Sequence, residues 1–174
     1  MPGDNQFAAQ PALNEVYTET NVMVAMRDGV RLACDIYRPA KSGSPIDGVF
    51  PVLLSRTPYS KTRADLAHDA SFYAAQGYVS VLQDCRGRYE SGGGFTKYVA
   101  EGEDGFDTMA WLSKQPWFGG KIGTYGLSYS AHTQAAAACL NPPNLACMWM
   151  DSGGFSNAFL NACRNGGAFE LRQL

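Results

Sequence analysis

Apolar and polar positions alternate near the start of the chain. Residues 21–27 and 30–37 alternate as strands with one buried face do, and Asp28 and Gly29 stand between them. Both turn residues tolerate a positive φ angle, so the segment predicts a β-hairpin closed by a type I′ turn. Pro39 has no backbone N–H to donate, and we expect the second strand to stop there.

Farther along, apolar runs alternate with segments of helical character. Four runs are typical of strands buried on both faces of a parallel sheet: residues 49–55, 78–83, 122–125 and 145–150. Three segments between them have helical spacing or high helix propensity: residues 64–76, 102–114 and 130–140. This alternation predicts an α/β fold, with a mostly parallel sheet opened by the antiparallel hairpin and helices on both faces.

The most informative stretch is the corner between the run 122–125 and the alanine-rich segment 130–140. A strand, a tight Gly126-Leu127-Ser128 turn and a helix together describe a nucleophile elbow. Such a corner lifts a serine hydroxyl clear of the sheet and aims the next backbone N–H at the place where an oxyanion forms. The usual pattern is G-x-S-x-G, and here the fifth position is Ser130. That position needs a small residue because the helix crosses close to the strand.

Length and charge exclude several classes of partner. The 174 residues carry a net charge of −2 and no basic patch, which argues against a nucleic-acid partner. No apolar run approaches the roughly 20 residues of a membrane span. Residues 1–15 lack the charged and apolar regions of a secretory signal. We therefore expect a cytoplasmic protein that does not associate with membranes.

Neither the cysteines nor the glycines indicate a metal or a cofactor. The five cysteines are widely spaced without a C-x-x-C pair, so we expect no metal site and no disulfide framework, with most of them buried. The glycines at 92–94 lack the spacing and following helix of a dinucleotide or phosphate loop. Asp84 and Arg86 are expected to pin a loop, and Gly87 to let its backbone turn.

Five motifs occur in a recognisable order. They are M-R-D-G-V-R-L-A-C-D-I-Y-R-P (26–39), R-T-P-Y (56–59), D-C-R-G-R-Y-E-S-G-G (84–93), E-D-G-F-D-T-M-A-W-L (103–112) and Q-P-W-F-G-G-K-I-G-T-Y-G-L-S-Y (115–129). In this order and spacing the chain resembles the CocE/NonD family of serine hydrolases, which includes X-Pro dipeptidyl-peptidases. The resemblance implies an α/β-hydrolase fold.

The resemblance also implies roles for three residues. Ser128 would be the acylated nucleophile, the backbone N–H of Tyr129 one oxyanion donor, and the phenol of Tyr59 the other. Tyr59 has independent support, because it stands just past a predicted strand end, follows a proline, and carries a hydroxyl that donates at neutral pH. The alternative is an ordinary half-buried loop tyrosine.

The N-terminal residues by themselves predict a loosely attached arm, residues 1–20. The resemblance covers about residue 22 to the C-terminus and implies two further parts. Residues 21–154 would be the N-terminal part of the α/β-hydrolase domain, which is incomplete at its C-terminus. Residues 155–174 would begin a helical cap insertion.

A serine nucleophile needs a base and an acid to orient it, and in α/β-hydrolases these follow the serine in the chain. Of the two histidines, His68 precedes Ser128, and His132 lies four residues past it on the elbow helix. We expect His132 to be packed or to face solvent, with a role as base as the alternative. Asp151 ends the strand after the elbow, and we expect a turn or capping role for it, with the catalytic acid as the alternative.

Two classes of function follow. The first is a serine hydrolase that cleaves acyl esters or amides, with acid and base outside this chain, which alone would be inactive. Within that class an esterase is favoured over an X-Pro dipeptidyl-peptidase, because no feature marks a site for a substrate's free amino terminus. Small esters, amides or short peptides would be the substrates. The second is a catalytically incomplete association module, whose open sheet edge pairs with a complementing C-terminal segment or another copy.

Overall fold

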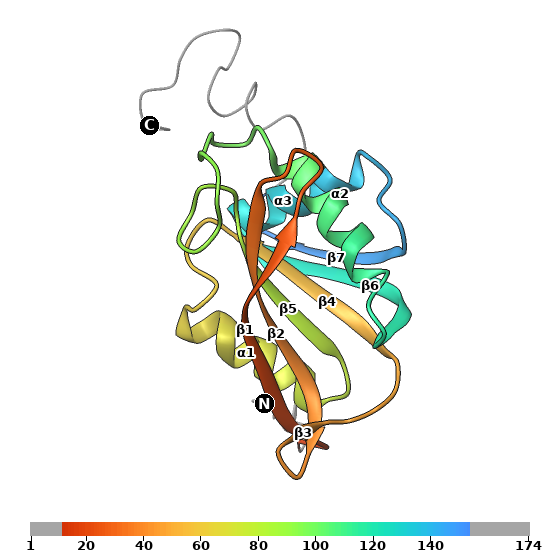
Figure 1. Cartoon of the computed structure of the whole chain (residues 1–174). Helices are drawn as coiled ribbons and strands as arrows, with labels where there is room; N and C mark the ends of the chain where they lie inside the picture. The colour runs from red at the N-terminus through yellow and green to blue at the C-terminus, as the bar shows by residue number, and fades with distance from the viewer. Residues whose placement is uncertain (1–11, 154–174) are drawn as a thin grey trace, which may run out of the picture.

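The strands and helices form one mixed sheet with helices on both sides (Figure 1). The computed structural model describes residues 12–153. The strands are β1 (Glu15–Ala25), β2 (Arg31–Lys41), β3 (Ser44–Pro45), β4 (Phe50–Thr57), β5 (Val79–Asp84), β6 (Phe118–Leu127) and β7 (Leu145–Asp151). The helices are α1 (Ala64–Ala75), α2 (Glu101–Leu112) and α3 (Tyr129–Ala138).

The strand order explains how one sheet combines both pairing modes. It is β1-β2-β5-β4-β6-β7, with β3 paired to β2. β1, β2 and β5 pair antiparallel, whereas β5, β4, β6 and β7 are parallel neighbours. The predicted α/β layout, a mostly parallel sheet opened by an antiparallel hairpin, is confirmed.

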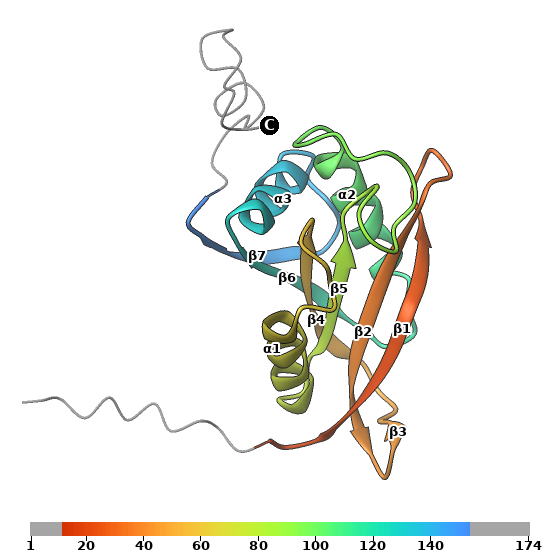
Figure 2. The same cartoon turned by 90° about the vertical axis from the view of Figure 1, so that its left-hand side faces the viewer.

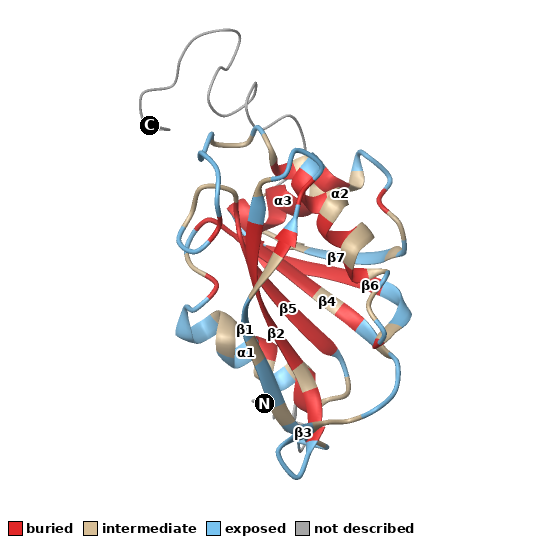
Figure 3. Ribbon diagram, in the orientation of Figure 1, coloured by how far each residue is buried: buried red, intermediate tan, exposed pale blue. Residues whose placement is uncertain are grey.

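The helices cover opposite faces because successive strand residues point to opposite sides. On β4, Leu53 packs with the cluster that contains Ala70 and Ala74 of α1. The next residue, Leu54, belongs to the larger core with Met109 of α2. Figure 2 shows α1 well apart from the α2–α3 pair, and Figure 3 shows that the buried residues concentrate in the central strands.

The turn between β1 and β2 differs from the predicted type I′ turn. Gly29 has a φ of 85°, and it is the only residue of the turn with a positive φ. The Met26 N–H donates to the Val30 carbonyl at 2.8 Å, and the Gly29 N–H donates to the Met26 carbonyl at 2.9 Å. The loop therefore has three residues and a single left-handed glycine, which is the next most common way to close a hairpin.

Two predicted boundaries of the hairpin were wrong. β2 continues through Pro39 to Lys41, because Tyr37 is its last partner on β5 and the proline interrupts no bond to that strand. β1 begins at Glu15, inside the predicted arm of residues 1–20. A register shift between Glu19 and Val22 breaks the alternation along β1, which hid its first half. Residues 1–11 and the expected cap at 155–174 lie outside the described residues.

The cysteines are less buried than expected. Cys34 and Cys85 are buried, whereas Cys139 and Cys147 are exposed; Cys163 lies outside the described residues. Burial raises the pKa of the Cys34 thiol to about 12. Between residues 12 and 153, no helix has the length and apolar character needed to cross a bilayer.

β7 forms an open edge of the sheet in the part of the chain that the structure describes. It pairs with β6 on one side, and no described strand pairs with its other side. Its side chains are unusually accessible, with Trp149 62% exposed and Met148 39% exposed. An apolar edge strand of this kind offers unpaired backbone groups to another chain.

We expect this edge to cause concentration-dependent self-association, which Trp149→Lys should weaken several-fold, because a charge on an edge strand opposes pairing. Sedimentation velocity over a dilution series measures the effect. Val49→Lys is the matched control, since Val49 is 65% exposed and precedes β4. Equal association of both variants and the unmodified chain would show that β7 is not the contact.

Candidate active site

The corner between β6 and α3 has the geometry of the predicted elbow. Ser128 is exposed and adopts φ 59° and ψ −113°, a left-handed conformation that non-glycine residues seldom adopt and that concentrates at functional sites. Its N–H donates to the Asp151 carbonyl at 2.9 Å, which ties the corner to the end of β7. The strand, turn and helix are as predicted; the nucleophilic role of Ser128 stays a prediction.

Two glycines let the chain turn this sharply. A Cβ on Gly126, where φ is 154°, would lie 2.4 Å from the Cβ of Ser130. A Cβ on Gly153 would lie 2.8 Å from the Ser128 carbonyl oxygen. Ser130 is itself buried. The helix therefore crosses the strand at near-contact distance, which is the reason why the fifth position of the motif takes only a small residue.

Tyr129 presents its backbone to the site and buries its side chain. As the first residue of α3, its N–H has no acceptor within the helix. The phenol donates to Glu101 Oε1 at 2.9 Å and accepts the Tyr98 N–H at 2.9 Å. Burial, with the nearby Glu101 carboxylate, raises the pKa of the Tyr129 phenol. These two hydrogen bonds hold the Tyr129 side chain in place at the start of α3.

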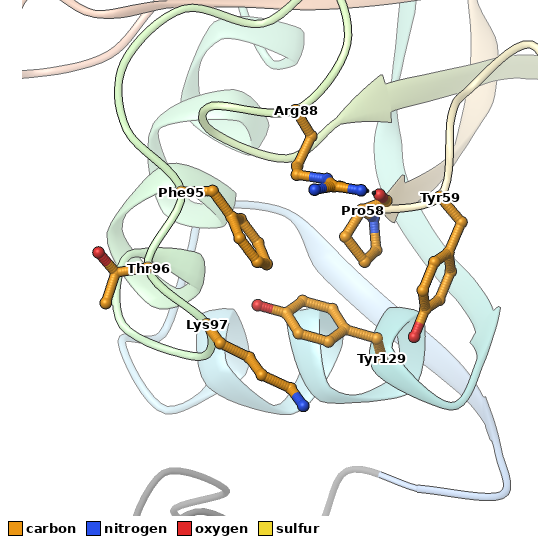
Figure 4. A pocket seen from close by; sticks show the side chains of 7 residues that line it. All are labelled: Pro58, Tyr59, Arg88, Phe95, Thr96, Lys97 and Tyr129. Atoms are coloured by element: carbon orange, nitrogen blue, oxygen red, sulfur yellow. Dashed lines mark hydrogen bonds between the residues drawn. The ribbon is translucent and has the colours of Figure 1, made fainter. Parts of the chain in front are cut away.

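Tyr59 lies beside Tyr129 because β4 and β6 are parallel neighbours and both residues follow strand ends. Tyr59 is 44% exposed. Its ring meets that of Tyr129 edge-on, with centroids 6.4 Å apart, and Figure 4 shows its hydroxyl directed toward the start of α3. The structure brings together the three residues that the sequence singled out, and their catalytic roles stay predictions.

A buried lysine that sequence reasoning missed holds the loop of Tyr59. Lys61 is 1% exposed, and its ammonium lies 3.0 Å from Asp35 Oδ1 and donates to Asn21 Oδ1 at 2.8 Å. Its backbone N–H donates to Asp84 Oδ1 at 2.7 Å. In the sequence Ser60-Lys61-Thr62-Arg63, nothing distinguished this lysine from a surface residue.

A buried arginine, Arg56, holds the elbow in a similar way. Its Nη1 donates to the Glu101 carbonyl at 2.7 Å, and its Nη2 lies 3.1 Å from Glu101 Oε2. Its Nε donates to Gln83 Oε1 at 2.7 Å. Because Glu101 also accepts the Tyr129 phenol, a buried charged chain connects the end of β4 to the first residue of α3.

Asp84 and Arg86 have structural partners, as predicted, although they hold two different loops. Asp84 binds the loop after β4 through Lys61. Arg86 forms ion pairs with Asp104 of α2 at 2.6 Å and with Asp28 of the hairpin turn at 2.7 Å. Gly87 allows the turn that follows, since its φ is 65° and a Cβ there would clash with backbone at 2.2 Å.

Neither histidine is placed to serve as the base. His68 is exposed on α1, on the other face of the sheet. His132 is 6% exposed, its ring packs edge-on against Tyr98 with centroids 4.6 Å apart, and neither ring nitrogen has a hydrogen-bond partner among the described residues. Of the expected alternatives, the packed one is observed. Asp151 accepts the Ser152 hydroxyl at 2.6 Å; its expected turn or capping role stays a prediction.

A cavity of about 510 Å³ opens beside the elbow (Figure 4). Its lining residues are Pro58, Tyr59, Arg88, Phe95, Thr96, Lys97 and Tyr129. Most of this lining is aromatic or apolar, and its size falls in the range of small-molecule sites. Tyr59 and Tyr129 belong both to this wall and to the candidate oxyanion hole, so the cavity adjoins the residue that follows Ser128 in the chain. Among residues 12–153, no group of acidic, histidine or cysteine side chains is arranged to bind a metal.

Comparisons with known proteins were made against family models, curated proteins and solved structures. Residues 28–174 match the model of the X-Pro dipeptidyl-peptidase (S15) family. Cocaine esterase of Rhodococcus sp. (strain MB1 Bresler) is 43% identical over 123 residues, which are 68% of this chain and 21% of the esterase.

Solved structures extend the likeness to the fold. An α-amino acid ester hydrolase has a TM-score of 0.65 at 30% identity, over 85% of this chain and 28% of that chain. A CocE/NonD family hydrolase from Staphylococcus aureus has a TM-score of 0.65 at 34% identity, over 75% of this chain and 26% of that chain. The chain spans about a fifth of the length of the curated relatives it matches.

We expect His132 to make stability depend on pH. Burial lowers the pKa of its ring, with Arg56 acting in the same direction and Glu101 opposing, so the unfolded chain binds the proton more readily. Stability should therefore be lost as the pH falls below about 6.5, the ordinary value of histidine.

The measurement is the melting temperature at pH 7.5 and pH 5.5 for the unmodified chain and His132→Leu. The variant should lose less on acidification, since its other titrating groups are unchanged. His68→Leu, which removes the exposed histidine, should behave like the unmodified chain. Equal losses in all three proteins would mean that His132 does not control this dependence.

Proposed function

The chain belongs to the X-Pro dipeptidyl-peptidase (S15) family, and we propose that it carries the nucleophile and the oxyanion hole of a serine hydrolase that cleaves acyl esters or amides. The single observation that supports this most is the left-handed Ser128, exposed at the elbow beside the free N–H of Tyr129. A strained, exposed serine next to unpaired donors is the arrangement that acyl transfer requires.

In the proposed reaction, Ser128 Oγ attacks the substrate carbonyl carbon while a base takes the hydroxyl proton. The carbonyl π electrons move to oxygen, and the oxyanion accepts hydrogen bonds from the Tyr129 N–H and the Tyr59 phenol. Collapse restores the carbonyl and expels the alcohol or amine, which takes the proton from the base. Water then cleaves the acyl-enzyme by the same steps.

The base in this proposal is a histidine outside the present chain, together with its acid. The positions of the two histidines support this: among the described residues the ring nitrogens of buried His132 have no hydrogen-bond partner, and His68 is exposed on α1. We therefore expect this chain alone not to turn over substrate.

We favour esters over X-Pro peptides. A peptidase that removes dipeptides must bind a free amino terminus, for which a carboxylate is the natural partner. The cavity beside Ser128 is lined instead by the cations Arg88 and Lys97, with no described carboxylate in its wall. Two of the relatives named above are esterases by name.

The second candidate is an association module without catalysis, and the exposed edge strand β7 favours it. The two candidates differ in one respect that can be measured. A hydrolase requires that Ser128 react with acyl groups once a base is supplied, whereas an association module does not.

Imidazole should supply the missing base. We expect p-nitrophenyl butyrate to acylate the chain at Ser128 in an imidazole-dependent manner, because a free base can take the hydroxyl proton at an open site. Intact-mass spectrometry and p-nitrophenol release measure the reaction. Ser128→Ala gives the background that imidazole alone produces. Identical behaviour of both proteins at every imidazole concentration would contradict the proposal, and serine-dependent turnover without imidazole would contradict the absence of a base.

Tyr59→Phe should slow the imidazole-dependent acylation roughly 100-fold, since removing one oxyanion donor costs about 3 kcal/mol of barrier. The phenylalanine keeps the ring contact with Tyr129. Tyr78→Phe removes a similarly exposed phenol just before β5 and should have no effect. Equal rates for both variants would exclude Tyr59 from the oxyanion hole.

A further inference from the structure

We propose that the cavity beside Ser128 binds a carboxylate carried by the substrate, with Arg88 as the residue that selects it. This inference rests on the proposed function, because it names the class of ester cleaved there: one whose acyl group has an apolar or aromatic body and an anionic end. Figure 4 shows the guanidinium at the rim of the cavity, above Phe95 and Tyr129.

Arg88 is the cavity's unpaired arginine among the described residues. Five other described arginines form ion pairs with carboxylates: Arg27, Arg38, Arg56, Arg63 and Arg86. Arg88 forms none within residues 12–153, although Glu90 is only two residues away. A charge that a fold leaves without a protein partner at the wall of a cavity is available to a ligand.

The guanidinium is held in place before any ligand arrives. Its Nε donates to the Pro58 carbonyl at 3.0 Å. The Phe95 and Tyr89 rings lie under it, with centroids 5.2 and 5.4 Å from the guanidinium carbon. Its backbone is fixed by a turn in which the Arg88 N–H donates to the Cys85 carbonyl at 3.0 Å. Among residues 12–153, these contacts leave Nη1 and Nη2 without an acceptor, and those two groups form the fork that binds carboxylates bidentately.

The remaining wall suits the body of such a substrate. Pro58, Phe95 and Tyr129 supply apolar and aromatic surface, against which a flat acyl group can pack. Lys97 adds a second positive charge to the lining, and no described aspartate or glutamate belongs to it. The charge of the cavity therefore favours an anion over a neutral group of the same shape.

Monomethyl terephthalate and methyl 4-carbamoylbenzoate form a matched pair of ligands, since they differ mainly by a carboxylate and a neutral amide. Isothermal titration into the unmodified chain should show the anionic ester binding about tenfold more tightly, the effect of one charge-assisted hydrogen-bonded contact. Titration into Ser128→Ala should give the same preference, because binding does not need the serine.

Arg88→Gln should remove most of the preference while leaving affinity for the neutral amide unchanged, because glutamine keeps a donor but loses the charge, and Lys97 remains in the lining. Arg88→Lys should retain part of it. Lys121→Gln is the control for net charge, because Lys121 is exposed near the start of β6, at the other end of that strand from Ser128. Circular dichroism confirms that each variant is folded.

Equal affinity of the two ligands for the unmodified chain, no saturable binding of either, or an undiminished preference in folded Arg88→Gln would each overturn the inference. Failure of the proposed reaction would look different. Arg88-dependent selectivity in a chain that shows no Ser128-dependent acylation would support the carboxylate site and count against the reaction alone.

Discussion

The close crossing of α3 over β6 is the constraint on which this site depends. Gly126 and Ser130 approach so nearly that a Cβ at the glycine would overlap the serine. Between them, Ser128 takes a conformation with a positive φ of 59°. One steric requirement therefore exposes the hydroxyl and also places the Tyr129 N–H at an open helix start, so hydroxyl and donor are oriented together.

Buried charges connect this corner to the neighbouring strand ends. Arg56 at the end of β4 contacts Glu101, which accepts the Tyr129 phenol, while Lys61 holds the loop that carries Tyr59. Buried ion pairs add little net stability because desolvation offsets their attraction. Their role here is to fix positions, since each holds a candidate oxyanion donor in place relative to the sheet.

Among the described strands, the central ones are covered on both faces, whereas β7 has a neighbour on one side only. Helices provide this cover, and Trp149 on β7 is mostly exposed. The elbow stands next to that open edge, and the Asp151 carbonyl at the end of β7 holds the Ser128 N–H. A chain that paired with this edge would therefore lie one strand away from Ser128.

Local patterns in the sequence determined the α/β class, the hairpin and the elbow, because each depends on neighbours in the chain. The predicted turn type was wrong because Asp28-Gly29 suits more than one kind of hairpin loop. The predicted start of β1 was wrong because the register shift after Glu19 hides the alternation of the strand's first half. The sequence also named Ser128, Tyr59 and Tyr129. Only the tertiary structure showed that Lys61 is buried. Within the described part of the chain, it also showed that the ring nitrogens of His132 have no hydrogen-bond partner and that no carboxylate lines the cavity beside Arg88. These properties depend on contacts between residues that are distant in the chain, and spacing along the sequence does not predict such contacts.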